Sequence, residues 1–91
     1  MRVAQIIEAK LAAALSPTKL SVIDDSARHA GHAGARDGGE SHFQLEIVSA
    51  EFIGKSRMAR HRMVYQLLAE ELKGPIHALS LVTRTPEEGQ I

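Results

Sequence analysis

Imidazole side chains are the strongest metal ligands in this sequence, and three of its five histidines lie close together. His29, His32 and His42 fall within residues 27–43, whereas His61 and His77 occur later in the chain. The chain has no cysteine, so it cannot itself supply the thiolates that iron–sulfur clusters usually require. Any metal chemistry here therefore depends on histidine and carboxylate groups.

The sequence also allows two simpler kinds of chemistry to be considered, a zinc site and an enzyme active site. The two-residue gap between His29 and His32 matches many zinc sites, but no cysteine accompanies it, so adventitious zinc and plain solvated loop residues remain alternatives. The sequence contains no G-x-S-x-G elbow, no H-E-x-x-H pair and no phosphate-binding P-loop. We therefore predict that the protein is not an enzyme.

The composition indicates one small domain with a thin aliphatic core, because the 91 residues are 44% hydrophobic and include only two phenylalanines and one tyrosine. Eleven basic and eleven acidic side chains give a formal charge of zero, so nucleic-acid binding would need a local basic patch. No apolar run approaches the roughly 18 residues of a membrane span, and the N-terminal residues lack the apolar run of a signal peptide. We expect a soluble, cytoplasmic protein.

Hydrophobic periodicity predicts one helix and two strands in the first half of the chain. A helical i, i+3, i+4, i+7 pattern covers residues 3–15 and ends at the Ser-Pro pair 16–17. A short strand is expected from Lys19, and a second over residues 42–49, whose apolar side chains alternate with polar ones. The segment between them holds four glycines and is far longer than a tight hairpin needs, so it is either functional or slack.

The second half predicts a longer helix and a third strand. Ser56 is a suitable N-cap for a helix that Gly74 and Pro75 end. Residues 76–84 are expected to form a strand, and the polar tail 86–91 to be flexible. The element order α-β-β-α-β makes this an α+β fold in one domain, residues 1–85, with helices on one face of a small sheet.

The order of elements also predicts which histidines meet. A strand-helix-strand crossover makes the second and third strands parallel, so their N-terminal ends share one edge of the sheet. The glycine-rich segment feeds the second strand and His77 stands at the start of the third, so the segment's histidines and His77 converge. His61 lies roughly 16 Å from the end of the helix that leads to His77, and we interpret it as a residue that packs or caps locally.

The sequence resembles the BolA family in a set of motifs that occur in order over most of the chain. These motifs are "DDSARHAGHAG", "GESHF", "FIGKSRMARHRMVY", "LAEEL" and "IHALSLVTRTPEE". The phrase F-x-G-x5-R-H-R over residues 52–62 is the most specific of them. The resemblance implies a KH-like fold of the second class, with a three-stranded mixed sheet, which agrees with the periodicity.

The resemblance also implies a partner and a cofactor. BolA proteins share a 2Fe-2S cluster with a monothiol glutaredoxin and its bound glutathione, and they contribute nitrogen ligands. The ligand at the entry of the third strand falls on His77, and the second lies in the preceding loop, where the family spacing falls on His29 and leaves His32 open. His42, at the same edge, is either a supporting neighbour of the site or an exposed strand residue.

Nitrogen ligation has consequences for the role of such a cluster. Two imidazoles on one iron raise the reduction potential above that of a plant-type all-cysteine site. Imidazole leaves metal on protonation, so the cluster is expected to be acid-sensitive and easily handed over. This favours transfer or sensing, with the isolated chain free of cofactor and monomeric or weakly dimeric.

The alternative function is DNA or RNA binding, because KH-like folds bind nucleic acids and BolA relatives are described as transcriptional regulators. A basic cluster at the start of the long helix would supply the contacts: Lys55, Arg57, Arg60 and Arg62. KH recognition, however, needs a G-x-x-G loop between two helices, and the segment at that place reads "GKSR". The one G-x-x-G, residues 31–34, lies between two strands.

Overall fold

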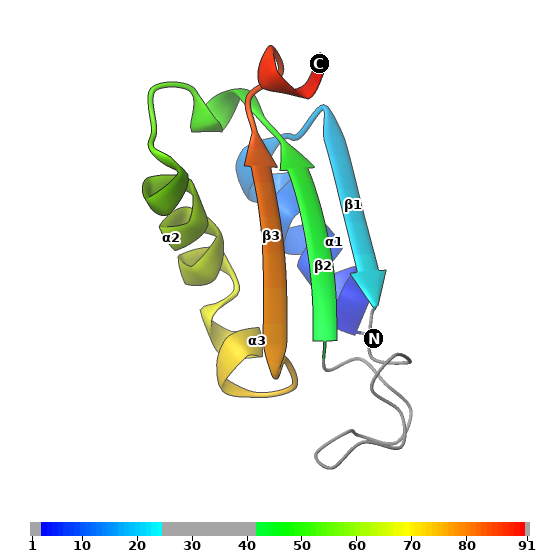
Figure 1. Ribbon diagram of the computed structural model, residues 1–91. Helices are drawn as coiled ribbons and strands as arrows, with labels where there is room; N and C mark the ends of the chain where they lie inside the picture. Colours follow the sequence, from blue (N-terminus) through cyan, green and yellow to red (C-terminus); the bar gives the residue numbers. More distant parts are fainter. Residues whose placement is uncertain (1–2, 25–41, 91) are drawn as a thin grey trace.

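The computed structural model describes residues 3–24 and 42–90, and it confirms the predicted α+β fold (Figure 1). Two short 3-10 turns, η2 and η3, accompany the helices and strands. The elements are α1 (Val3–Leu15), β1 (Lys19–Asp24), β2 (His42–Val48), η2 (Ala50–Phe52), α2 (Arg57–Leu67), α3 (Ala69–Lys73), β3 (Ala78–Arg84) and η3 (Glu88–Gln90). None of the helices in these ranges is long and apolar enough to cross a bilayer.

The sheet is mixed, as the crossover argument predicted, and its strand order is β1-β2-β3. β1 runs antiparallel to β2, with Leu20 opposite Ile47, and β2 runs parallel to β3, with Leu45 opposite Leu81. The central strand follows a period of two, because Phe43, Leu45 and Ile47 are all at most 2% exposed. This alternation directs one face of the sheet into the core.

The core lies between that face of the sheet and the helices. Helix α1 buries Ile7, Leu11 and Leu15 at helical spacing, and α2 adds Val64. Phe43 and the fully buried Phe52 are its aromatic members, as the composition predicted for a thin aliphatic core.

The long helix that we predicted over residues 56–74 is interrupted. Ser56 caps α2 by accepting a hydrogen bond from the Ala59 N–H at 3.1 Å, as expected. Leu68, at φ −104° and ψ 19°, then separates α2 from α3. Leu68 is fully buried, and the change of direction there brings Glu71 of α3 within hydrogen-bonding distance of Lys10 on α1.

The third strand begins two residues later than the sequence predicted, at Ala78 rather than Ile76. The N–H of Ile76 donates to the main-chain carbonyl of Glu71 at 2.9 Å, so it is not available to the sheet. Ile76 is instead a core residue that is 4% exposed. His77 consequently lies in the bend that immediately precedes β3.

The polar tail, which we expected to be flexible over residues 86–91, has contacts around its first turn, and its flexibility stays a prediction. The Thr85 N–H donates to Glu88 Oε1 at 2.9 Å, and the Glu88 N–H donates back to Thr85 Oγ1 at 3.2 Å. This reciprocal pair is a capping box for η3. Gly89 lies against the sheet, where an added Cβ would come within 3.0 Å of Val48 Cγ1.

Candidate functional site

Two histidine rings lie in contact at the edge of the sheet where the parallel strands begin. His42 is the first residue of β2, and it pairs in register with Ala78, the residue after His77. The ring centroids of His42 and His77 are 5.3 Å apart and their planes make an angle of 60°. The parallel pairing of β2 and β3 thus confirms the expected shared edge, and we refer to these two residues as the histidine pair.

The histidine pair places two nitrogen-bearing rings side by side at this edge, and a neutral imidazole nitrogen is a common metal ligand. The side chain of His77 is exposed and that of His42 is half-buried. A partner molecule can therefore reach the pair from solvent.

The donor set of the histidine pair makes only part of a metal centre. Within residues 3–24 and 42–90, no group of three or more histidine, cysteine, aspartate or glutamate side chains could hold a metal ion. The sequence has no cysteine at all. The pair fits an iron–sulfur cluster only if a second molecule brings the thiolates.

The two other predicted ligands, His29 and His32, lie outside the described residues. The residues that flank their segment are Asp24, the last of β1, and His42, the first of β2. Asp24 pairs with Phe43 in register, so both flanking residues lie at the edge that carries the histidine pair. The choice between His29 and His32 stays a prediction.

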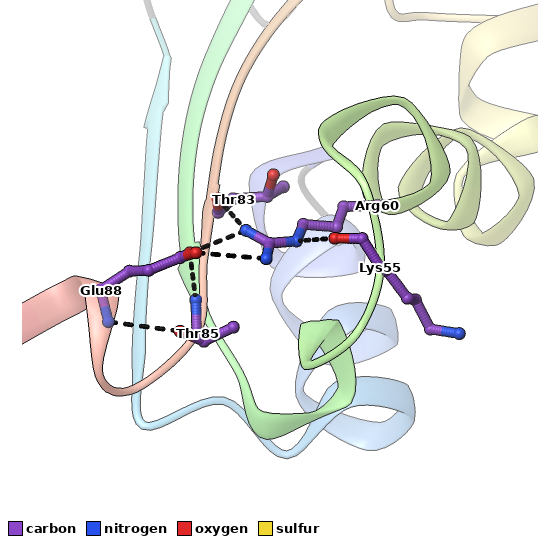
Figure 2. A network of polar contacts seen from close by, with 5 residues as sticks. All are labelled: Lys55, Arg60, Thr83, Thr85 and Glu88. Atoms are coloured by element: carbon purple, nitrogen blue, oxygen red, sulfur yellow. Dashed lines mark hydrogen bonds and ion pairs between the residues drawn. The ribbon is translucent and has the colours of Figure 1, made fainter.

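Arg60 is the most highly connected member of the predicted basic cluster, and Figure 2 shows its contacts. Its Nε donates to the Lys55 carbonyl at 3.0 Å, and its Nη1 donates to the Thr83 carbonyl at 3.2 Å. Its Nη1 and Nη2 also donate to the Glu88 carboxylate at 2.7 and 3.3 Å. These four hydrogen bonds use most of the five donors of a guanidinium. Arg60 therefore joins α2, β3 and η3, and it has little capacity left for a phosphate.

The Glu88 carboxylate responds to this environment. The hydrogen bond from Arg60 lowers the pKa of Glu88, and the bond from the Thr85 N–H lowers it further. Glu88 was not among the predicted site residues, although T-x-x-E over residues 85–88 is a recognisable capping-box signal. The pairing of Glu88 with Arg60, 28 residues away, has no local signal in the sequence.

The other basic side chains, Lys55, Arg57 and Arg62, are exposed. Helix α2 contains no acidic residue, so no carboxylate of its own helix can pair with the exposed Arg57 and Arg62. Beside it a groove of about 540 Å³ separates α2 from β3. Its lining residues are Arg57, Arg60, His61, Leu81, Val82, Thr83, Arg84 and Glu88.

His61 belongs to this groove and not to the histidine pair. It is half-buried on α2 and faces the C-terminal half of β3, from Leu81 to Arg84. The histidine pair lies at the other end of β3, where Ala78 and Thr83 are separated by five steps along the strand, which is about 16 Å. The structure thus agrees with a local packing position for His61.

Comparison with protein families gives a match over most of the chain. Residues 11–88 match the model described as "BolA-like protein". The chain is 52% identical over 86 residues to SufE-like protein 1, chloroplastic/mitochondrial, of Arabidopsis thaliana, which covers 90% of this chain but only 23% of that protein. It is 47% identical over 88 residues to the DNA-binding transcriptional regulator BolA of Escherichia coli, which covers 97% of this chain and 80% of the relative.

Solved structures agree in fold as well as in sequence. The structure of BolA1 from Arabidopsis thaliana superposes with a TM-score of 0.87 at 44% identity, over 97% of this chain and 96% of that one. At this identity and coverage, the likeness extends to the order of the elements and to the mixed sheet.

Proposed function

Because the chain belongs to the BolA-like protein family, we propose that it is an iron–sulfur trafficking or sensing protein that carries a 2Fe-2S cluster jointly with a monothiol glutaredoxin and glutathione. The observation that supports this proposal best is the histidine pair, with ring centroids 5.3 Å apart at one edge of the sheet. In this role the cluster is cargo, and the partner supplies the thiolates that this chain lacks.

His77 is the fixed nitrogen ligand in this proposal. Its main chain lies between the buried Ile76 and the first residue of β3, while its side chain is exposed. His29 or His32 supplies the second nitrogen from the segment joined to the same edge. His42 supports His77 through the ring contact and limits the orientations that the His77 imidazole can adopt.

The nitrogen ligands give the cargo its lability. A neutral imidazole binds metal and a protonated one does not, so mild acid releases the cluster from this chain first. Such a site suits transfer or sensing better than permanent electron transport. The same proposal includes a non-enzymatic role, a cytoplasmic location, and a chain that is monomeric or weakly dimeric without its partner.

Reconstitution tests the proposal directly. The chain, a monothiol glutaredoxin, glutathione, iron and sulfide are mixed without oxygen, and visible absorption, circular dichroism and electron paramagnetic resonance of the reduced sample are recorded. We expect a coloured heterodimer from wild type and none from His77→Ala. His61→Ala is the matched control, because it removes a histidine that is remote from the pair. A stable 2Fe-2S centre on the isolated chain, or a wild-type spectrum from His77→Ala, would refute the proposal.

The loop histidines are tested in the same assay. We expect His29→Ala to be partly rescued by His32, because three residues of flexible chain span up to roughly 10 Å. Only the double variant His29→Ala/His32→Ala should match His77→Ala. A wild-type spectrum and potential in the double variant would exclude the loop as a source of ligands.

The second candidate function is nucleic-acid binding, favoured by one relative's name, DNA-binding transcriptional regulator BolA, and by the exposed basic residues of α2. Binding through these residues should fall steeply with salt and should weaken in Arg57→Ala and Arg62→Ala. Arg60→Ala is a poor probe because that side chain also holds Glu88. Sequence-dependent affinity at micromolar or tighter at physiological salt would place this function first.

A further inference from the structure

Glu71 is a charged residue in an apolar setting. It is only 7% exposed and lies on α3, a helix of five residues between the buried Leu68 and the buried Ile76. A carboxylate in such a place is costly unless it is paired and hydrogen-bonded. The residue that pairs with Glu71 therefore identifies the element to which α3 is joined.

Lys10 on α1 is that partner. Its Nζ donates to both carboxylate oxygens of Glu71 at 2.9 Å, and it lies 3.8 Å from the exposed carboxylate of Glu70. The hydrogen bond to Glu71 is the main cause that raises the pKa of Lys10. The ion pair joins residues 61 positions apart and anchors the short α3 to the long α1.

The main chain of Glu71 connects this anchor to the histidine pair. Its carbonyl oxygen accepts hydrogen bonds from the N–H of Gly74 at 3.2 Å and from that of Ile76 at 2.9 Å. These two bonds shape the turn that leads directly into His77. Figure 1 shows α3 and this turn at the end of the sheet where β3 begins. The turn that precedes His77 is thus hydrogen-bonded to the same residue whose side chain anchors α3 to α1.

We propose that Glu71 and Lys10 are positioning residues for His77, and that their ion pair holds its imidazole beside His42. The inference rests on the proposed function, because it assigns a purpose to the orientation of a metal ligand. A buried ion pair often adds little stability compared with apolar residues of similar size, but in some proteins it selects one arrangement of the elements it joins. Here the selected arrangement is the distance between the two imidazoles.

The test measures the histidine pair in the isolated chain, without glutaredoxin or iron. All variants carry His29→Ala/His32→Ala, so that zinc alone, used as the probe, reports on His42 and His77. The readouts are the nuclear Overhauser contact between the two imidazole rings and the zinc affinity. Lys10→Gln breaks the ion pair, Lys10→Arg preserves it, and Lys10→Met/Glu71→Met replaces it by apolar side chains.

We expect Lys10→Gln and the double methionine variant to lose the ring contact and to bind zinc about tenfold more weakly, which is the usual effect of removing a residue that orients a metal ligand. Lys10→Arg should retain both. The matched control is Lys19→Gln, which removes an ion pair with Glu46 within the sheet. It should leave ring contact and zinc affinity unchanged.

Several results would overturn the positioning role. The first is an intact ring contact and an unchanged zinc affinity in folded Lys10→Gln. The second is a loss of ring contact and zinc affinity in Lys10→Arg that equals the loss in Lys10→Gln. The third is unfolding of the double methionine variant, which would make the ion pair a requirement of the whole fold. Failure of the proposed function is distinguishable. In that case wild type forms no mixed cluster with glutaredoxin, while the ring contact still depends on Lys10 and Glu71.

Discussion

Replacing Arg60 separates a structural role of the basic cluster from a binding role. Arg60→Ala removes hydrogen bonds to the main-chain carbonyls of Thr83 and Lys55, together with the ion pair to Glu88. The side chain of Arg60 is only 12% exposed, and its guanidinium lies 5.9 Å from the centre of the Phe52 ring. Water therefore has little access to the side chain of Arg60 in the folded protein.

The size of the effect follows from these contacts. A hydrogen bond from a charged donor contributes about 1.5–3 kcal/mol, and the partly buried bond to Thr83 is the one for which this value holds best. The bond to Lys55 and the pair with Glu88 are solvent-exposed and weaker. We expect Arg60→Ala to lower the free energy of unfolding by about 2 kcal/mol. At a urea slope of roughly 1–2 kcal/mol/M, the midpoint falls by about 1–2 M.

Urea denaturation followed by far-ultraviolet circular dichroism measures this shift. Arg57→Ala is the matched control, since Arg57 lies on the same helix with an exposed side chain, and its effect should stay within about 0.5 kcal/mol. Equal midpoints for Arg60→Ala and Arg57→Ala would refute the structural role of Arg60 and return it to the set of nucleic-acid contacts.

Three further predictions concern the tail and the core. The pKa of Glu88 is lowered in the folded state. The contribution of this carboxylate to stability is therefore present above the ordinary glutamate pKa of about 4.3, and it is lost as the pH falls through the lowered pKa. Urea midpoints measured between pH 6 and pH 3 should fall less steeply in Glu88→Gln than in wild type. Gly89→Ala forces its new Cβ against Val48, and thermal melting should show a loss of about 1 kcal/mol, whereas an unchanged melting temperature would mean that η3 does not pack on the sheet. Leu11→Ala empties a fully buried position of α1 and should cost about 2–5 kcal/mol in urea denaturation; a loss under 1 kcal/mol would contradict the core described above.

The sequence alone determined the order of strands and main helices and the edge at which the histidines meet. Alternation over Phe43, Leu45 and Ile47 and the helical spacing from Val3 to Leu15 are local patterns, and burial on one face of a sheet enforces them. The strand-helix-strand crossover then makes β2 and β3 parallel, so the placement of His77 near His42 followed from topology without any knowledge of side-chain contacts.

Only the tertiary structure decided which distant groups are paired. Glu71 appeared as one residue of a long helix, and its burial depends on Lys10, which is 61 positions away. Arg60 appeared as one of four similar cations until folding placed Glu88 and the Thr83 carbonyl around it. Periodicity records which face of an element is apolar, but the partner of a buried charge is chosen by how the elements pack, because desolvation leaves that charge stable only where the fold supplies the opposite one.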